Sequence, residues 1–111
     1  MIALFSYGTL QQREVQIANY GRELRGEADV LIGYRLEPLV IDDLDVVEVS
    51  GKAVHTIARV TGDPDDRIPG TLFEVSEAEL RSTDAYETKA YSRIEGTLES
   101  GRTAFLYVAR E

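Results

Sequence analysis

The chain has 111 residues, of which 43% are hydrophobic and 29% charged, and this composition is typical of one soluble globular domain spanning residues 1–111. The formal net charge is −8 and the basic residues are scattered, so we expect no nucleic-acid partner. The absence of cysteine excludes disulfides, a thiol nucleophile and thiolate metal sites. There is no apolar run of about 18 residues and no basic leader before an apolar segment, so we expect no membrane association and a cytoplasmic location.

The first predicted element is a strand over 2–6, which leads into Tyr7, Gly8, Thr9 and Leu10. Gly8 can take the positive φ that a tight turn often needs, or allow a close approach that a Cβ would disturb. With a helix following, the N–H groups of Gly8, Thr9 and Leu10 would lie at its N-terminus and favour a small anion such as a carboxylate. The hydroxyls of Tyr7 and Thr9 would lie beside that anion. The alternative is an ordinary strand-to-helix turn.

The remaining elements follow from periodicity and turn residues. Apolar spacing predicts a helix from Gln11 to Tyr20 with Gly21 as its stop. Further strands are predicted over 28–41 (interrupted near Gly33 and Pro38), 46–49, 54–60, 71–75, 91–98 and 102–109, the last two joined as a hairpin through 99–101. A capping box at 76–79 begins a second helix that runs to about Tyr86. Strands and two short helices in this order indicate an α+β fold with a curved or closed sheet.

Two groups of residues are weak candidates for chemistry. His55 is the one histidine, it lies in an alternating strand, and no Gly-x-Ser-x-Gly turn accompanies it, so a structural role is favoured over catalysis. Asp42, Asp43 and Asp45 lack the spacing of a calcium loop, and together with the acidic segment 63–66 they are typical of solvated loops. We therefore predict no metal site.

Glu87 is the stronger candidate, because it falls where the second helix gives way to the next strand. Tyrosines on either side can shield its carboxylate from water, and partial burial would raise its pKa towards the range of a general base. We expect it to stay mostly ionised at neutral pH. Asp84, three residues earlier, is assigned to the structure of the helix end. The alternative for Glu87 is a solvated acid paired with Lys89 or Arg93.

Three segments, taken in order, resemble the gamma-glutamylcyclotransferase-like superfamily, which includes AIG2-like proteins. Tyr7-Gly8-Thr9-Leu10 resembles the substrate-binding loop of that superfamily, and 68–75 resembles its central strand. Asp84-Ala85-Tyr86-Glu87 followed by Tyr91-Ser92-Arg93 resembles the acidic motif that carries its catalytic Glu. The resemblance spans nearly the whole chain.

The resemblance implies a small mixed β-barrel flanked by short helices, with a pocket at one barrel mouth. It implies an enzyme that releases 5-oxoproline from a gamma-glutamyl amine or gamma-glutamyl amino acid, by attack of the substrate's own α-amino group, with no metal or organic cofactor. Glu87 would be the general acid/base, and the substrate-binding residues would be Tyr7, Gly8, Thr9, Leu10 and Tyr91. The second interpretation is a non-catalytic protein that binds a small metabolite in the same pocket. No feature of the sequence indicates an oligomeric state.

Overall fold

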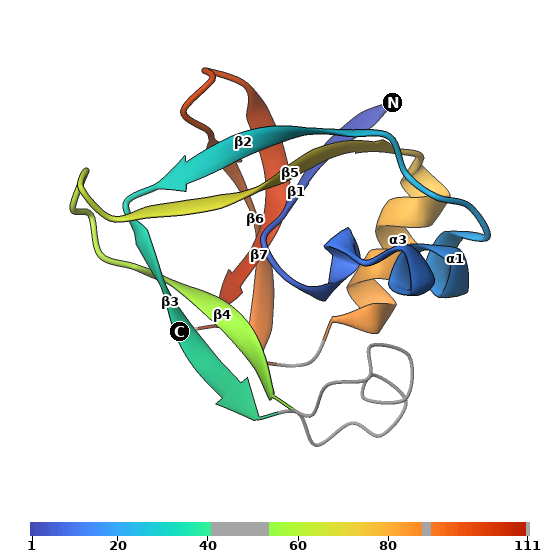
Figure 1. The fold of residues 1–111 in the computed structure, drawn as a ribbon, viewed down its shortest axis with the longest axis horizontal. Coiled ribbons are helices and arrows are strands. Elements are labelled where there is room, and N and C mark those ends of the chain that lie inside the picture. Colours follow the sequence, from blue (N-terminus) through green and yellow to red (C-terminus); the bar gives the residue numbers. More distant parts are fainter. Residues whose placement is uncertain (41–53, 88–89, 111) are drawn as a thin grey trace.

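The computed structural model describes residues 1–40, 54–87 and 90–110. Five described strands form one sheet in the order β2-β5-β1-β7-β6, and two others, β3 and β4, form a separate two-stranded sheet (Figure 1). The strands are β1 Ile2–Ser6, β2 Gly26–Ile32, β3 Tyr34–Val40, β4 Val54–Val60, β5 Arg67–Val75, β6 Tyr91–Thr97 and β7 Thr103–Ala109. The helices are the 3-10 turn η1 Thr9–Gln11, α1 Arg13–Tyr20 and α3 Glu77–Tyr86. The α+β class is as predicted.

The sheet is open, so the closed barrel expected from the resemblance is not what these strands form. The chain leaves the large sheet at Gly33, whose φ of 85° is disfavoured for residues with a Cβ. Its N–H donates to the carbonyl of Asp66 and its carbonyl accepts from Thr61, each at 2.8 Å. The segment predicted as one interrupted strand over 28–41 is therefore two strands in two sheets. β4 then packs against β7, which brings the small sheet over the large one.

Strand β1 lies at the centre of the large sheet. It pairs with β5 in antiparallel and with β7 in parallel orientation, so the sheet is mixed. Successive side chains of a strand point to opposite faces. Accordingly Leu4 and Phe5, both almost fully buried, belong to two different hydrophobic clusters, one on each face of the sheet. Because β1 is buried on both faces, its position in the sheet is fixed. The position of Tyr7, which follows the C-terminal end of β1, is therefore fixed as well.

The two helices pack against each other beside the sheet (Figure 1). α1 ends at Gly21, which has the left-handed φ of 69° expected of such a stop. The capping box of α3 is confirmed: Ser76 Oγ accepts from the N–H of Glu79 at 3.1 Å, and the Glu79 carboxylate accepts from the N–H of Ser76 at 2.8 Å. This cap fixes where α3 begins.

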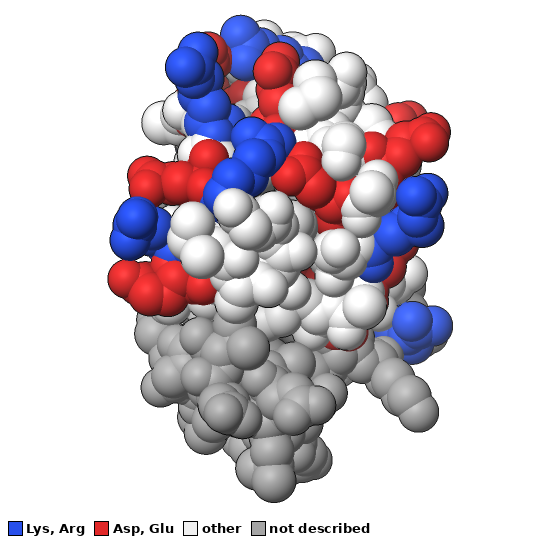
Figure 2. Space-filling view, turned by 90° about the vertical axis from the view of Figure 1, so that its right-hand side faces the viewer, with Lys and Arg blue, Asp and Glu red and all other residues white. Residues whose placement is uncertain are grey.

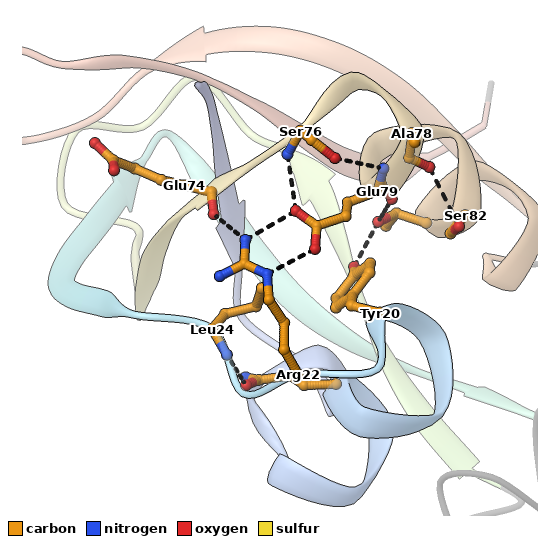
Figure 3. A network of polar contacts seen from close by, with 10 residues as sticks. Tyr20, Arg22, Leu24, Glu74, Ser76, Ala78, Glu79 and Ser82 are labelled. Atoms are coloured by element: carbon orange, nitrogen blue, oxygen red, sulfur yellow. Dashed lines mark hydrogen bonds and ion pairs between the residues drawn. The ribbon is translucent and has the colours of Figure 1, made fainter.

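A polar network joins the two helices and orients α3 (Figure 3). Arg22, just after α1, donates through two nitrogens to both oxygens of Glu79, each at 2.8 Å. The hydrogen bond from Arg22 holds the pKa of Glu79 well below its usual range, at about 2. One turn further along α3, the Thr83 hydroxyl bonds to the Tyr20 hydroxyl at 2.5 Å.

Acidic and basic side chains are interspersed over the face on which the helices lie (Figure 2). None of the helices in the described part of the chain is long and apolar enough to span a bilayer. The predicted strand at 46–49 and the acidic residues at 42–45 fall outside the described residues.

Candidate active site

A cavity of about 360 Å³ opens where the end of β1, the turn η1 and the end of α3 meet. All six residues that the sequence nominated for the site lie in its wall: Glu87, Tyr7, Gly8, Thr9, Leu10 and Tyr91. The other described residues of the wall are Phe5, Ser6, Gln11, Gln12, Thr56 and Tyr107. Two segments that are far apart in the chain are thus brought to one cavity, although the roles of these residues remain predictions.

The backbone at Gly8 differs from what the sequence suggested. Its φ is −124°, which is not the left-handed region, and a Cβ built on it would meet nothing within 4 Å. Gly8 is therefore required neither by a positive φ nor by a close contact within the protein. Gly8 needs no positive φ because the turn is made by η1. In η1 the N–H of Gln11 donates to the carbonyl of Gly8, and the N–H of Gln12 donates to the carbonyl of Thr9. Both bonds are compatible with ordinary negative φ values.

The loop also differs from a helix N-terminus. Only the three-residue turn η1 follows the loop, and α1 begins later, at Arg13, so the helix dipole invoked from the sequence does not act on this segment. What remains are individual donors. The N–H of Gly8 makes a long bond of 3.4 Å to Ser6 Oγ. The N–H groups of Thr9 and Leu10 have no acceptor within the part of the chain that the structure describes, and both residues line the cavity.

The tyrosine hydroxyls of the wall already use their protons. Tyr7 donates to the carbonyl of Tyr107 at 2.6 Å and accepts from the N–H of Ala58 at 3.0 Å. Tyr91 donates to the carbonyl of Thr56 at 2.7 Å. Because a tyrosine hydroxyl has one proton, Tyr7 and Tyr91 offer a ligand only acceptor lone pairs. The N–H groups of Thr9 and Leu10, unpaired among the described residues, are backbone donors of the wall that a negative charge in the cavity could use.

Glu87 is the C-cap residue of α3, and its N–H donates to the carbonyl of Thr83 at 3.0 Å. Burial raises the pKa of its carboxyl to about 8. The basic side chain once considered as its partner, Arg93, instead pairs with Asp84 at 2.9 Å, and Lys89 lies outside the described residues. At neutral pH the carboxyl is therefore mostly protonated, and the expectation that it stays mostly ionised is wrong. The pKa is raised because the carboxyl is buried and no cation among the described residues lies beside it to offset the burial.

Sequence reasoning missed Tyr107 as a part of the site. Its carbonyl holds the hydroxyl of Tyr7, and its own hydroxyl donates to Asp84. This bond and the ion pair with Arg93 place Asp84 in the support of the α3 end, which is the role it was assigned. Tyr107 lies in the middle of an apolar strand, where nothing in the local pattern distinguishes it from a core tyrosine.

The described wall can bind hydrogen-bond donors and anions at neighbouring points. It combines one carboxyl of raised pKa, hydroxyl oxygens that accept, and two unpaired N–H groups. Among the described residues, no three His, Asp or Glu side chains gather in a way that could hold a metal ion. This arrangement can move a proton at one point while holding an oxygen at another.

Residues 4–111 match the family described as "Gamma-glutamyl cyclotransferase, AIG2-like". No protein of curated function matches the chain.

Three solved structures share the fold. A solution structure from Arabidopsis thaliana is 21% identical, with a TM-score of 0.70 over 97% of this chain and 61% of its own. A structure titled "Gamma-glutamyl cyclotransferase" is 15% identical, with a TM-score of 0.74 over 99% of this chain and 67% of its own. An uncharacterised protein from Pyrococcus horikoshii is 17% identical, with a TM-score of 0.66 over 98% of this chain and 78% of its own. The chain thus spans about three fifths of the length of the Arabidopsis structure.

Proposed function

Because the chain belongs to the gamma-glutamyl cyclotransferase, AIG2-like family, we propose that it releases 5-oxoproline from a gamma-glutamyl amine or gamma-glutamyl amino acid. The observation that carries the proposal is that Glu87, whose carboxyl has a raised pKa, lines the same cavity as the loop from Tyr7 to Leu10. A general base and a set of oxyanion donors are the two groups this cyclisation needs.

The reaction begins with proton transfer. The α-ammonium of the substrate cannot attack, so the ionised Glu87 carboxylate takes one proton from it. The free amine then attacks the γ-carbonyl carbon and closes a five-membered ring. Since nucleophile and electrophile belong to one molecule, holding the substrate in a folded conformation supplies much of the rate enhancement.

The tetrahedral intermediate carries its negative charge on the former carbonyl oxygen. We assign the stabilisation of this oxygen to the N–H groups of Thr9 and Leu10, because neither has a protein acceptor among the described residues. The intermediate collapses as the bond from the γ-carbon to the leaving nitrogen breaks. The proton held by Glu87 goes to that nitrogen, which restores the carboxylate. The ring nitrogen, which carries two protons after the attack, passes one of them to the freed amine, so 5-oxoproline and an ammonium product leave.

The pKa of Glu87 suits both halves of this cycle. Because the carboxyl has a pKa of about 8, its ionised form is a stronger base than an ordinary carboxylate. Its protonated form can still return the proton near neutral pH. The substrate ammonium, once bound, favours the ionised form of the carboxyl because opposite charges stabilise each other. Glu87 therefore becomes ionised in the complex in which its charge is needed.

The test is a screen of gamma-glutamyl amines and gamma-glutamyl dipeptides for release of 5-oxoproline, with Glu87→Gln as the matched control. Turnover by the parent and its loss in the variant would support the proposal. Turnover of none of these compounds, together with a clear thermal shift on adding 5-oxoproline, would replace it with the non-catalytic binding protein.

A further inference from the structure

A side-chain hydrogen bond connects the loop to the helix that carries Glu87. The hydroxyls of Thr9, in η1, and Tyr86, the last residue of α3, lie 2.6 Å apart. Tyr86 precedes Glu87 directly. We propose that Thr9 and Tyr86 are a positioning pair, which holds the Glu87 carboxyl in place against the Tyr7-to-Leu10 loop. The naming of Glu87 as the base rests on the proposed function, whereas the positioning itself can be measured without turnover.

The pair is the last of three attachments on one side of α3. Glu79, Thr83 and Tyr86 are spaced i, i+4 and i+7, so they lie on one face of the helix. Glu79 is held by Arg22, which follows α1 in the chain. Thr83 is held by Tyr20, the last residue of α1. Tyr86 is held by Thr9, which belongs to the cavity wall. The start and middle of α3 are thus fixed to α1, and its end is fixed to the site.

The end of a helix is where fraying begins, because the last carbonyls have no partner within the helix. Glu87 is the C-cap, so any opening of the last turn displaces its carboxyl directly. The ring of Tyr86 is buried, with 7% of the residue exposed, and this leaves the hydroxyl little freedom to follow a moving loop. A bond between this fixed hydroxyl and Thr9 therefore restrains the loop and the helix end relative to each other.

The positioning also bears on the titration of Glu87. Burial raises the pKa of the Glu87 carboxyl, and the loop lines the same cavity as this carboxyl. If the loop separated from the end of α3, water would reach the carboxyl and its pKa would fall towards the value in water.

The experiment uses Tyr86→Phe and Thr9→Val, each of which removes one hydroxyl and keeps the shape of the side chain. The primary measurement is the titration of the Glu87 carboxyl by carbon-detected NMR. We expect its pKa to fall by about one unit in each variant, and the double variant to fall no further than either single one. With a substrate that the parent turns over, kcat should fall on the order of tenfold with little change in KM.

Tyr20→Phe is the matched control. It removes a hydroxyl from the same helix pair and breaks the bond to Thr83, but Thr83 keeps the bond from its hydroxyl to the carbonyl of Glu79 at 2.9 Å. The N–H of Glu87 also keeps its bond to the Thr83 carbonyl. Tyr20→Phe should therefore lower stability about as much as Tyr86→Phe while leaving the Glu87 titration and kcat near those of the parent.

The proposal is overturned if Glu87 titrates as in the parent in both Tyr86→Phe and Thr9→Val, including the case in which kcat falls. It is equally overturned if Tyr20→Phe shifts the titration as much as Tyr86→Phe, because the effect would then be general loosening of α3. If the parent turns over no gamma-glutamyl compound, the proposed function fails, and the titration alone still decides the role of the pair.

Discussion

Glu87 and Tyr7 face one cavity from the end of α3 and the end of β1, close enough that the carboxylate charge acts on the phenol. Burial raises the pKa of Tyr7, its bond from the Ala58 N–H opposes this, and the Glu87 charge raises it further. Tyr91 follows the same pattern, with burial first and the Glu87 charge second. No cation among the described residues offsets the burial of the Glu87 carboxyl, so a bound cation would favour its ionised form. This is the property that a site for a substrate ammonium requires.

The first prediction concerns the base. Glu87→Gln keeps the volume of the side chain and its hydrogen-bonding shape but cannot take up a proton, so turnover should fall on the order of a hundredfold or more. Binding of 5-oxoproline, measured by calorimetry, should change little. Asp84→Asn is the control: Asp84 holds Arg93 and Tyr107 at the helix end, so its loss should reduce turnover less than about tenfold. Full activity of Glu87→Gln would exclude Glu87 as the base.

The second prediction concerns pH. In the free protein the Glu87 carboxyl ionises with a pKa of about 8, and only the ionised form can accept the substrate proton. The value of kcat/KM should therefore rise with pH up to about 8 and level off above it, since kcat/KM reports the ionisations of the free enzyme. The residual activity of Glu87→Gln should lack this rise. A profile that is already flat from about pH 5 upward would show that a group of ordinary carboxylate pKa, or none, controls the reaction.

The elements of the fold could largely be predicted because local signals and tertiary packing agree. β1, with Leu4 and Phe5 each buried on one face, appears in the sequence as a short apolar run. The capping box at Ser76 and the stop at Gly21 depend on contacts within a few residues. The closed barrel was wrong because closure depends on which strands pair. Gly33 signals an interruption in the sequence, but not that the chain moves from one sheet to another there.

The members of the candidate site could be nominated, but not their interactions. The bond between Thr9 and Tyr86 joins residues 77 positions apart, and no local pattern indicates such a contact. Gly8 was nominated for a conformational reason that the backbone does not support. The sequence predicted the direction of the Glu87 pKa shift from the neighbouring tyrosines, but not its size, because the extent of burial depends on the tertiary packing around the end of α3.

The third prediction separates two glycines near the site. A Cβ at Gly8 meets open space, so Gly8→Ala should fold with a stability within about 1 kcal/mol of the parent. A Cβ at Gly70, in β5, would meet the carbonyl of Ser6 and lie 2.6 Å from the ring of Phe5. Gly70→Ala should therefore destabilise the fold by about 3 kcal/mol. Urea unfolding of both variants measures this contrast, and equal losses would contradict it.

The fourth prediction concerns acid stability. The pKa of Glu79 is lowered from 4.5 to about 2, first by its hydrogen bond from Arg22, with burial opposing. A carboxyl with a lowered folded pKa stabilises the protein above its unfolded pKa, and this contribution is lost as the pH falls from 4.5 to about 2. Glu79→Gln should accordingly be less stable than the parent near neutral pH, and the difference should shrink over this acidic range. A difference that stays constant down to about pH 2 would assign the loss to packing instead.

The last prediction reverses that sign for Glu87. Its folded pKa is raised from 4.5 to about 8, so folding favours the protonated form. Below pH 4.5 the carboxyl is protonated in both states and imposes no penalty. Between 4.5 and about 8 the unfolded chain gains stability by ionising while the folded protein does not, so the free energy of unfolding falls. Above about 8 both states are ionised, and the penalty of a buried charge stays constant.

Glu87→Gln removes this penalty without changing the volume of the side chain. Its free energy of unfolding should exceed that of the parent by an amount that grows from about pH 5 to about pH 8 and then levels off. Chemical unfolding at several pH values, with Asp84→Asn measured alongside, isolates this difference from the titration of other carboxyls. A buried carboxyl that raises its own pKa and lowers the stability of the fold is expected where that carboxyl takes part in catalysis. A Glu87→Gln variant that is no more stable than the parent at high pH would show that water reaches the carboxyl freely.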